Sequence, residues 1–199
     1  MKKHKLNNLT LIIPAKNEIE SIDDVLKECL EYDKDLKILI IVDNNDDNTL
    51  NSHFLNSKYD NISYTISNYP TYSGAVRHGV EVAKTDFCCI YNADGSFVPH
   101  SLEDMYEFTN KFDFIYCSRY KKNGSSDDDT IITFIGNKIF TLLGKILFGV
   151  KVSDILYSYI LFRRSEFLNL KLKSKDFNLA LELPIMNALK KSKYIDLAS

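Results

Sequence analysis

Short runs of strand-forming residues recur along the first 118 residues, and most end abruptly at polar or turn-forming residues. These runs, rich in Ile, Val, Leu, Tyr and Cys, cover residues 9–13, 38–42, 62–66, 87–91 and 114–117. The segments between them place apolar residues at helical spacing, as residues 22–30 do. Strands that alternate with helices in this way predict an α/β fold with a largely parallel sheet and right-handed crossover connections.

Polar clusters follow three of the expected strands at the point where each strand ends. They begin at Pro14, Asp43 and Asn92. Because the carboxyl ends of parallel strands meet at one rim of a sheet, these clusters are expected to lie together, where open α/β sheets bind their ligands. The rim is therefore the predicted functional site.

Asp94 follows the buried run at residues 87–91, and two interpretations of it are open. Its carboxylate could bond the backbone of its own turn. It could also bind Mg²⁺ or Mn²⁺, which typically take one or two protein carboxylates and complete their shell with phosphate oxygens and water. The spacing of these residues alone does not decide between the two interpretations. Asp43 itself is either a strand-end turn residue or an acceptor of hydrogen bonds from a base or ribose.

Composition and missing motifs exclude several classes of protein. A net charge of −2 argues against a protein built to bind nucleic acid. The basic start is not followed by the apolar core of a signal peptide, and no stretch is apolar enough to span a bilayer. No Gly-x-Gly-x-x-Gly follows the first strand and no P-loop is present, which disfavours a dinucleotide oxidoreductase.

The cysteines and histidines show no metal-ligand spacing. The cysteines are Cys29, Cys88, Cys89 and Cys117. They are expected to be buried, reduced thiols of a cytoplasmic protein. The histidines are His4, His53, His78 and His100. They are expected to be surface or packing residues.

The second half of the chain changes character. Residues 121–130 form a polar run that predicts a mobile loop, and the aspartates at 127–129 are expected to be solvated there. Residues 131–150 predict a long apolar helix with Lys138 and Lys145 on one side. This helix either lies against a membrane surface or is a core helix whose lysines reach solvent. A last helix is expected over residues 177–191, followed by a closing strand at 194–197.

Taken together, these motifs resemble glycosyltransferase family 2, and most closely its polyprenyl- or dolichyl-phosphate sugar synthase branch. Residues 12–18 resemble the opening strand and Pro-x-x-Asn-Glu turn of that family, residues 42–49 its Asp-Asp-x-x-Asp-x-Thr segment, and residues 92–96 its Asp-x-Asp motif. Residues 118–120, 136–138 and 152–164 resemble later motifs, and Phe177 and Glu182 continue the match.

The resemblance implies a GT-A fold, which is a Rossmann-like, mostly parallel central sheet flanked by helices on both faces. Residues 1–199 would form a single glycosyltransferase domain, with a nucleotide-sugar-binding half over 1–119 and an acceptor-side half over 120–199. The implied activity is inverting, metal-dependent transfer of a sugar from a nucleoside-diphosphate donor of the GDP-mannose or UDP-glucose type. The acceptor would be a polyprenyl phosphate or a growing glycan of the cell envelope, which implies peripheral contact with the cytoplasmic face of a membrane.

The resemblance also implies roles for individual residues. The nucleotide-binding residues would be Pro14, Ala15, Glu18, Asp43 and Asn92. Asp94, with Ser96 nearby, would hold Mg²⁺ or Mn²⁺ on the diphosphate. Arg119 would bind the acceptor phosphate, which its planar, permanently charged guanidinium suits. Asp154 lies where the family shapes the acceptor and sugar region, and it is the candidate base if the acceptor is a sugar hydroxyl.

Several positions depart from the family pattern. Asn44 and Asn92 stand where the family has aspartates, and Thr71 and Ser73 stand where loop glycines are expected. Because these changes lower the charge at the metal site, the alternative function is a catalytically degenerate member that binds nucleotide-sugar or a partner without turnover. A nucleotidyltransferase ranks last, since the residues after the first strand supply one lysine, Lys16, and no glycine.

Overall fold

The structure is a computed structural model and is described for residues 6–120 and 131–198. His4 and the loop expected at 121–130, with its aspartates, lie outside the described residues. The strands are β1 (Leu9–Ala15), β2 (Lys37–Val42), β3 (Ile62–Ile66), β4 (Phe87–Ile90), β5 (Phe114–Ser118), β6 (Ile160–Arg163) and β7 (Tyr194–Ala198). The helices are α1 (Ile22–Tyr32), α2 (His53–Asn56), α3 (Tyr72–Val82), α4 (Ser101–Glu107), α5 (Ile131–Phe148), α6 (Arg164–Leu170) and α7 (Leu179–Lys190), with short 3-10 turns η1 (Asn48–Asn51) and η2 (Asp176–Asn178).

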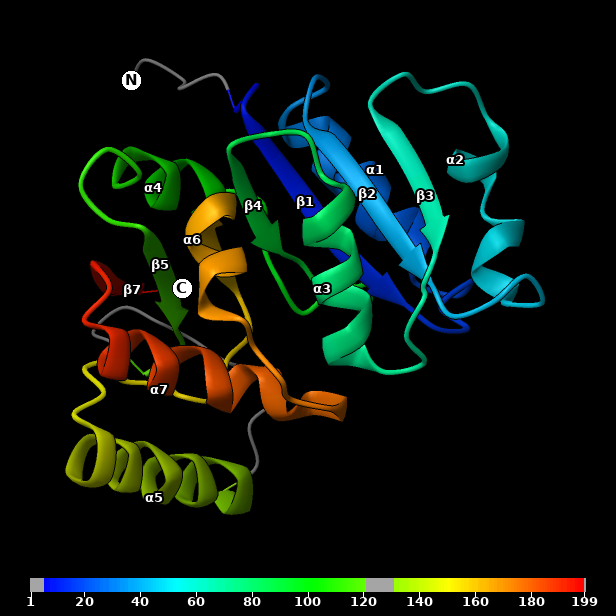
Figure 1. Ribbon diagram of the computed structural model, residues 1–199. Coiled ribbons are helices and arrows are strands. Elements are labelled where there is room, and N and C mark those ends of the chain that lie inside the picture. The colour runs from blue at the N-terminus through cyan, green and yellow to red at the C-terminus, as the bar shows by residue number, and fades with distance from the viewer. Residues whose placement is uncertain (1–5, 121–130, 199) are drawn as a thin grey trace.

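The strands form one sheet in the order β3-β2-β1-β4-β6-β5-β7 (Figure 1). β1 pairs in parallel with β2 and β4, and β2 pairs in parallel with β3. This confirms the predicted parallel arrangement of the first four strands. β6 was not predicted as a strand, and it enters antiparallel between β4 and β5. The expected closing strand is present as β7, parallel to β5.

Helices cover both faces of the sheet, as predicted. One apolar core joins the sheet to α1 and α4, with residues such as Ile22, Leu26 and Leu102 fully buried. The second core joins the other face to α3, α6 and α7, through residues such as Val76 and Leu183. α5 lies outside this second layer, next to α7 (Figure 1).

The close approach of α3 to the sheet depends on a glycine. A Cβ added at Gly79 would lie 2.5 Å from Cγ2 of Ile12 and 3.1 Å from the side chain of Ile41. Those distances are too short for non-bonded carbon atoms. The small residues on this face of α3 therefore let the helix lie close to the sheet, which brings the start of α3 to the ends of β1 and β2.

The four cysteines are buried and free, as expected. His53 and His100 are exposed, whereas His78 is buried in α3. Within the described ranges, no helix combines the length and apolar character that crossing a membrane requires.

Candidate functional site

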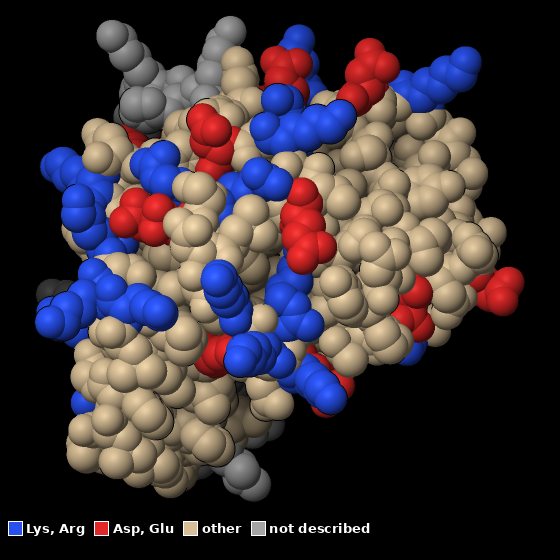
Figure 2. Space-filling view, viewed as in Figure 1, with Lys and Arg blue, Asp and Glu red and all other residues tan. Residues whose placement is uncertain are grey.

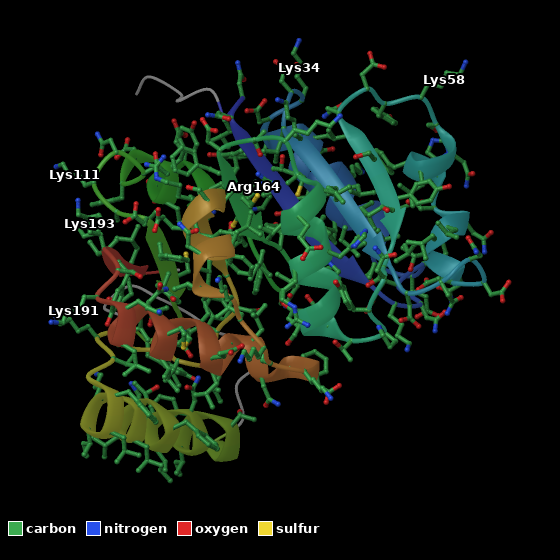
Figure 3. The ribbon with its side chains drawn as sticks, viewed as in Figure 1. Lys34, Lys58, Lys111, Arg164, Lys191 and Lys193 are labelled. Carbon is green, nitrogen blue, oxygen red and sulfur yellow. The ribbon has the colours of Figure 1, made fainter. Side chains whose placement is uncertain are left out.

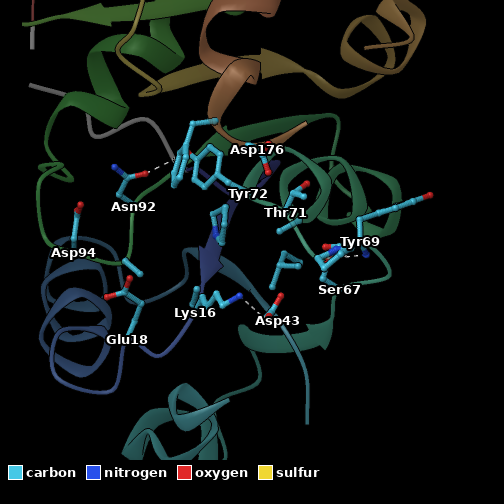
Figure 4. Close-up of a pocket in the computed structure, with 17 residues that line it drawn as sticks. Lys16, Glu18, Asp43, Ser67, Tyr69, Thr71, Tyr72, Asn92, Asp94 and Asp176 are labelled. Atoms are coloured by element: carbon cyan, nitrogen blue, oxygen red, sulfur yellow. Dashed lines mark hydrogen bonds and ion pairs between the residues drawn. The ribbon is translucent and has the colours of Figure 1, made fainter. Parts of the chain in front are cut away.

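A pocket of about 420 Å³ lies at the carboxyl ends of β1, β2 and β4 (Figure 4). Its lining includes Pro14, Ala15, Glu18, Asp43, Asn92 and Asp94. The turn between β3 and α3 and the η2 turn before α7 complete the wall. The three polar exits predicted to share one rim therefore do share it, because parallel pairing aligns the ends of these strands.

The loop after β1 is held in place by Asp47. The Asp47 carboxylate accepts backbone N–H groups from Asn17 and Thr49, both at 2.9 Å, and from Asp43 at 3.3 Å. The Thr49 hydroxyl oxygen in turn accepts the Glu18 N–H at 3.0 Å. These bonds fix the ends of β1 and β2 relative to each other, so that Glu18 and Asp43 line the same pocket.

The environment of Asp47 favours its charged form. Burial by itself raises the pKa of this carboxyl, but hydrogen bonds from Thr49, Asn17 and Asp43 outweigh burial and lower the pKa below its ordinary value of 3.8. Asp47 is thus an ionised support for the pocket, although it does not line the pocket itself.

The pocket wall is acidic. Its charged residues are Glu18, Asp43, Asp94 and Asp176, together with Lys16. The Lys16 ammonium lies 3.0 Å from the Asp43 carboxylate, so one positive charge is paired with an acid of the wall. The wall carries four carboxylates and one ammonium, so its negative charge would repel a diphosphate unless a cation were bound with it. The charges of the wall therefore suit a diphosphate bound together with a divalent ion.

Asp94 forms the turn that its sequence suggested and also lies exposed at the pocket edge. Its Oδ1 accepts the Ser96 backbone N–H at 2.9 Å, and Gly95 between them has φ +78°. The Asn92 amide donates to the Ser96 hydroxyl at 3.3 Å. The turn and metal interpretations are compatible, because the turn orients the carboxylate without burying it. Ser96 does not line the pocket but holds this turn.

Tyr72 and Phe177 of the pocket wall were not identified from the sequence as site residues. The Tyr72 hydroxyl donates to Asn92 Oδ1 at 3.3 Å, and its ring stacks on Phe177 at 5.0 Å. Burial, with a smaller contribution from the negative charge of Asp94, raises the pKa of Tyr72 to about 12, despite an opposing hydrogen bond with Ser158. Tyr72 is therefore a protonated donor at neutral pH.

The segment that carries Phe177 is hydrogen-bonded to side chains of α3 and α7. The Arg77 guanidinium donates to the Ser174 carbonyl at 2.6 Å, and the Ser73 hydroxyl donates to the Asp176 carbonyl. The Glu182 carboxylate accepts the backbone N–H groups of Lys173 and Ser174 at 2.8 to 3.1 Å. Phe177 itself is 75% exposed, so this segment holds an aromatic ring at the mouth of the pocket.

Arg119 and Asp154 form a second cluster, which is not part of the pocket lining. Arg119 Nε lies 2.8 Å from Asp154 Oδ2, and its terminal nitrogen lies 3.2 Å from Oδ1. The Asp154 side chain is fully buried and also accepts the Asn137 amide of α5. The guanidinium carbon lies 5.1 Å from the Tyr120 ring centre and 4.8 Å from that of Tyr157. These contacts fix Arg119 at the end of β5.

Within the described ranges, the site offers too few protein ligands to hold a metal by themselves. In the described part of the chain, no three His, Cys, Asp or Glu side chains are grouped so that they could hold an ion. An ion that takes only one or two protein carboxylates and a diphosphate fits this wall through Asp94 and Glu18.

Several of the wall residues that sequence interpretation missed come from the exit of one strand, β3. Ser67, Tyr69 and Thr71 follow β3, and the polar exit of that strand was not counted with the other three. Tyr72 begins α3, and the sequence interpretation gave it no role. Counting the exit of β3 would have found this wall, because β3 is parallel to β2. No local signal places Asp176 there, since it comes from a segment far along the chain.

A parallel β3-β2-β1-β4 sheet extended by an antiparallel strand, with an acidic pocket at its carboxyl edge, defines an α/β protein of the GT-A class. The sequence matches the profile of Glycosyl transferase family 2 over residues 10–170. The chain therefore belongs to this family. No curated protein matches the chain in sequence.

Solved structures of similar fold include two synthases of glycosyl-3-phosphoglycerates. Glucosyl-3-phosphoglycerate synthase from Mycobacterium tuberculosis, in complex with Mn²⁺, uridine diphosphate and phosphoglyceric acid, has a TM-score of 0.71 at 10% identity, over 96% of this chain and 68% of that one. Mannosyl-3-phosphoglycerate synthase from Rubrobacter xylanophilus has a TM-score of 0.67 at 14% identity, over 96% and 64%. The chain thus spans about two thirds of the length of these relatives.

Proposed function

We propose that the protein is an inverting, metal-dependent glycosyltransferase that takes a sugar from a nucleoside diphosphate. The observation that carries this proposal is the acidic pocket at the ends of β1, β2 and β4, in a chain of Glycosyl transferase family 2. The sugar donor is of the UDP-glucose or GDP-mannose type. Structures of the similar Mycobacterium tuberculosis synthase with UDP-glucose and Mn²⁺, or with UDP and Mg²⁺, support this class of donor and metal.

The donor would lie across the pocket from Asp43 to Asp94. Asp43, next to Ser67 and Tyr69, would accept hydrogen bonds from the base or ribose, while Pro14 and Ala15 pack against the nucleotide. Asp94 and Glu18, on the other side of the pocket (Figure 4), would hold Mg²⁺ or Mn²⁺. When bound, such an ion neutralises the charge that develops on the leaving diphosphate. Asn92, held by Tyr72, would bind the nucleotide through its amide.

The acceptor is proposed to carry a phosphate, such as the polyprenyl phosphate that the sequence suggested. Arg119 supplies a guanidinium whose orientation is set by Asp154, Tyr120 and Tyr157. A phosphate is already anionic at pH 7, so it can attack the sugar carbon without a strong base. The buried, ion-paired carboxylate of Asp154 fits this reaction as a group that positions Arg119 rather than as a base. A growing glycan remains the alternative acceptor.

The test measures release of nucleoside diphosphate from UDP-glucose and GDP-mannose in the presence of Mn²⁺, with polyprenyl phosphate, with 3-phosphoglycerate or with no acceptor. We expect acceptor-dependent release with one of the donors. Asp94→Ala should lower the rate at least 100-fold, about 2.7 kcal/mol of activation free energy. Asp60→Ala, in an exposed turn distant from the pocket, is the matched control. A rate that Asp94→Ala leaves unchanged would contradict the metal-binding role.

A second candidate function is binding of the nucleotide-sugar without turnover. The specific observation in its favour is that both ends of the Asn92 amide are used inside the protein, by Tyr72 and by Ser96. Asn92 is also neutral, so it brings no negative charge to the metal. Titration calorimetry that detects donor binding with Mn²⁺, while no acceptor in the panel yields product, would favour this function over the enzyme.

A further inference from the structure

α5 presents a broad apolar face to the outside of the molecule. Its exposed apolar side chains include Ile135, Ile139, Leu142, Leu143, Ile146 and Leu147, between 45% and 70% exposed. Positions 135, 139, 142 and 146 follow one stripe of the helix, and 143 and 147 lie beside it. The largest apolar patches of soluble monomers are commonly binding sites. This set of residues, the outer face of α5, is therefore a candidate interaction surface.

Within the described part of the chain, α5 packs on the protein through its opposite, narrow side. Asn137 and Thr141 are buried there, and Thr141 accepts the Ile155 backbone N–H at 3.3 Å. Gly144 lets the helix approach closely, since a Cβ at this position would lie 2.6 Å from Cδ1 of Ile155. These contacts hold α5 against the described residues, so its packing does not depend on the outer face.

The charges around the outer face are positive. The described part of α5 carries Lys138 and Lys145 and no acidic residue. Exposed Lys191 follows α7 and lies on the side of the molecule next to α5 (Figure 3). Figure 2 shows the surface over α5, at the lower left, as a largely uncharged area with Lys and Arg atoms along its upper border. An apolar helix bordered by lysines is complementary to an anionic lipid surface.

We propose that the outer face of α5 inserts into the interface of an anionic phospholipid membrane, with Lys138 and Lys145 at the level of the headgroups. A second copy of the chain fits this face less well. Two copies joined through α5 would bring their lysines together without an acidic partner on the same helix. Long lysine side chains can instead extend from an apolar surface toward lipid phosphates.

The proposal extends the proposed function, because α5 contacts the acceptor-side cluster directly. Asn137, on the packed side of the helix, donates to Asp154, and Asp154 holds Arg119. Insertion of the outer face would therefore place Arg119 within one helix diameter, about 10 Å, of the lipid surface. A phosphate carried by a membrane lipid would reach the site from that side.

The experiment is sedimentation of the full chain with vesicles of phosphatidylcholine alone or mixed with phosphatidylglycerol, without nucleotide or metal. We expect binding to the anionic vesicles. The double variant Ile146→Glu/Leu147→Glu should lower the partition coefficient at least tenfold, and Lys138→Glu/Lys145→Glu should abolish the preference for phosphatidylglycerol. Leu168→Glu, at an exposed position on α6, is the matched control and should bind normally.

Three results would overturn the proposal. They are no binding to either vesicle, binding that the Ile146→Glu/Leu147→Glu variant retains, and a dimer in light scattering that this variant converts to a monomer. The last result would assign the outer face to a second copy. All substitutions are at exposed positions, and circular dichroism checks that each variant is folded. Since the assay contains no donor, its outcome is independent of whether the protein transfers sugar.

Discussion

At the scale of single residues, a residue that holds the site in place matters as much as the residues that line it. Asp47 is buried and accepts three backbone N–H groups from the segments that follow β1 and β2. Its neighbour Asp43 lines the pocket, while Asp47 shapes it. The family resemblance placed both residues in one motif, but only the structure separates the two roles.

Asp47→Asn is expected to destabilise the protein by about 1–3 kcal/mol, because an amide nitrogen would face backbone donors that need an acceptor. The folded pKa of Asp47 is lowered, so its stabilising effect is fully present above the ordinary pKa of 3.8 and is lost as the pH falls through the lower folded value. Urea unfolding at pH 7 and at pH 3 measures the difference. A stability gap between wild type and variant that is as large at pH 3 as at pH 7 would contradict the ionised state.

At the scale of elements, the central strands were predictable and β6 was not. Residues 9–13, 38–42 and 87–91 are apolar on both faces, which marks buried parallel strands. β6 is only four residues long, and its apolar run Ile-Leu-Phe was not recognised as a strand. Its place between β4 and β5 depends on long-range pairing, which no local pattern encodes.

The segment before α7 carries Phe177 and is held in part by the Glu182 carboxylate, so a change at Glu182 should affect this segment selectively. Glu182→Gln removes a charged acceptor of the Lys173 and Ser174 N–H groups, so the segment carrying Phe177 should open more often. Hydrogen exchange at residues 173–178 is expected to accelerate at least fivefold, about 1 kcal/mol, while exchange in β1 stays unchanged. Glu31→Gln, exposed on α1, is the control. Equal acceleration in both variants would show that the Glu182 contacts are not specific.

At the scale of the whole molecule, the acidic wall makes nucleotide binding depend on a cation. We expect UDP or GDP to raise the melting temperature with Mn²⁺ present and to have little effect in EDTA. A ligand at 100 times its Kd adds about 2.7 kcal/mol. For a chain of this length that is a shift of about 5–10 °C. Scanning calorimetry of wild type and Asp94→Asn checks this, and a similar shift in EDTA would contradict a metal-bridged diphosphate.

The residues of the site could be predicted from the sequence only where they directly follow a strand. Pro14, Ala15, Glu18, Asp43, Asn92 and Asp94 meet in one pocket, as the parallel sheet required. The wall made by Tyr72, Asp176 and Phe177 depends on the packing of η2 against α3, between residues more than 100 positions apart. The roles of these residues, the cytoplasmic location and the absence of nucleic-acid binding stay predictions.

The antiparallel insertion of β6 has a consequence for how the chain folds during synthesis. The first four strands to assemble can pair as soon as residue 90 has been made. β5 is synthesised soon afterwards, but it joins the sheet only through β6 and β7. Its buried residues, such as Phe114 and Ile115, must therefore wait for about 45 further residues to leave the ribosome. We expect the nascent chain to be most prone to aggregate in that interval, when these apolar residues have no neighbouring strand to pair with.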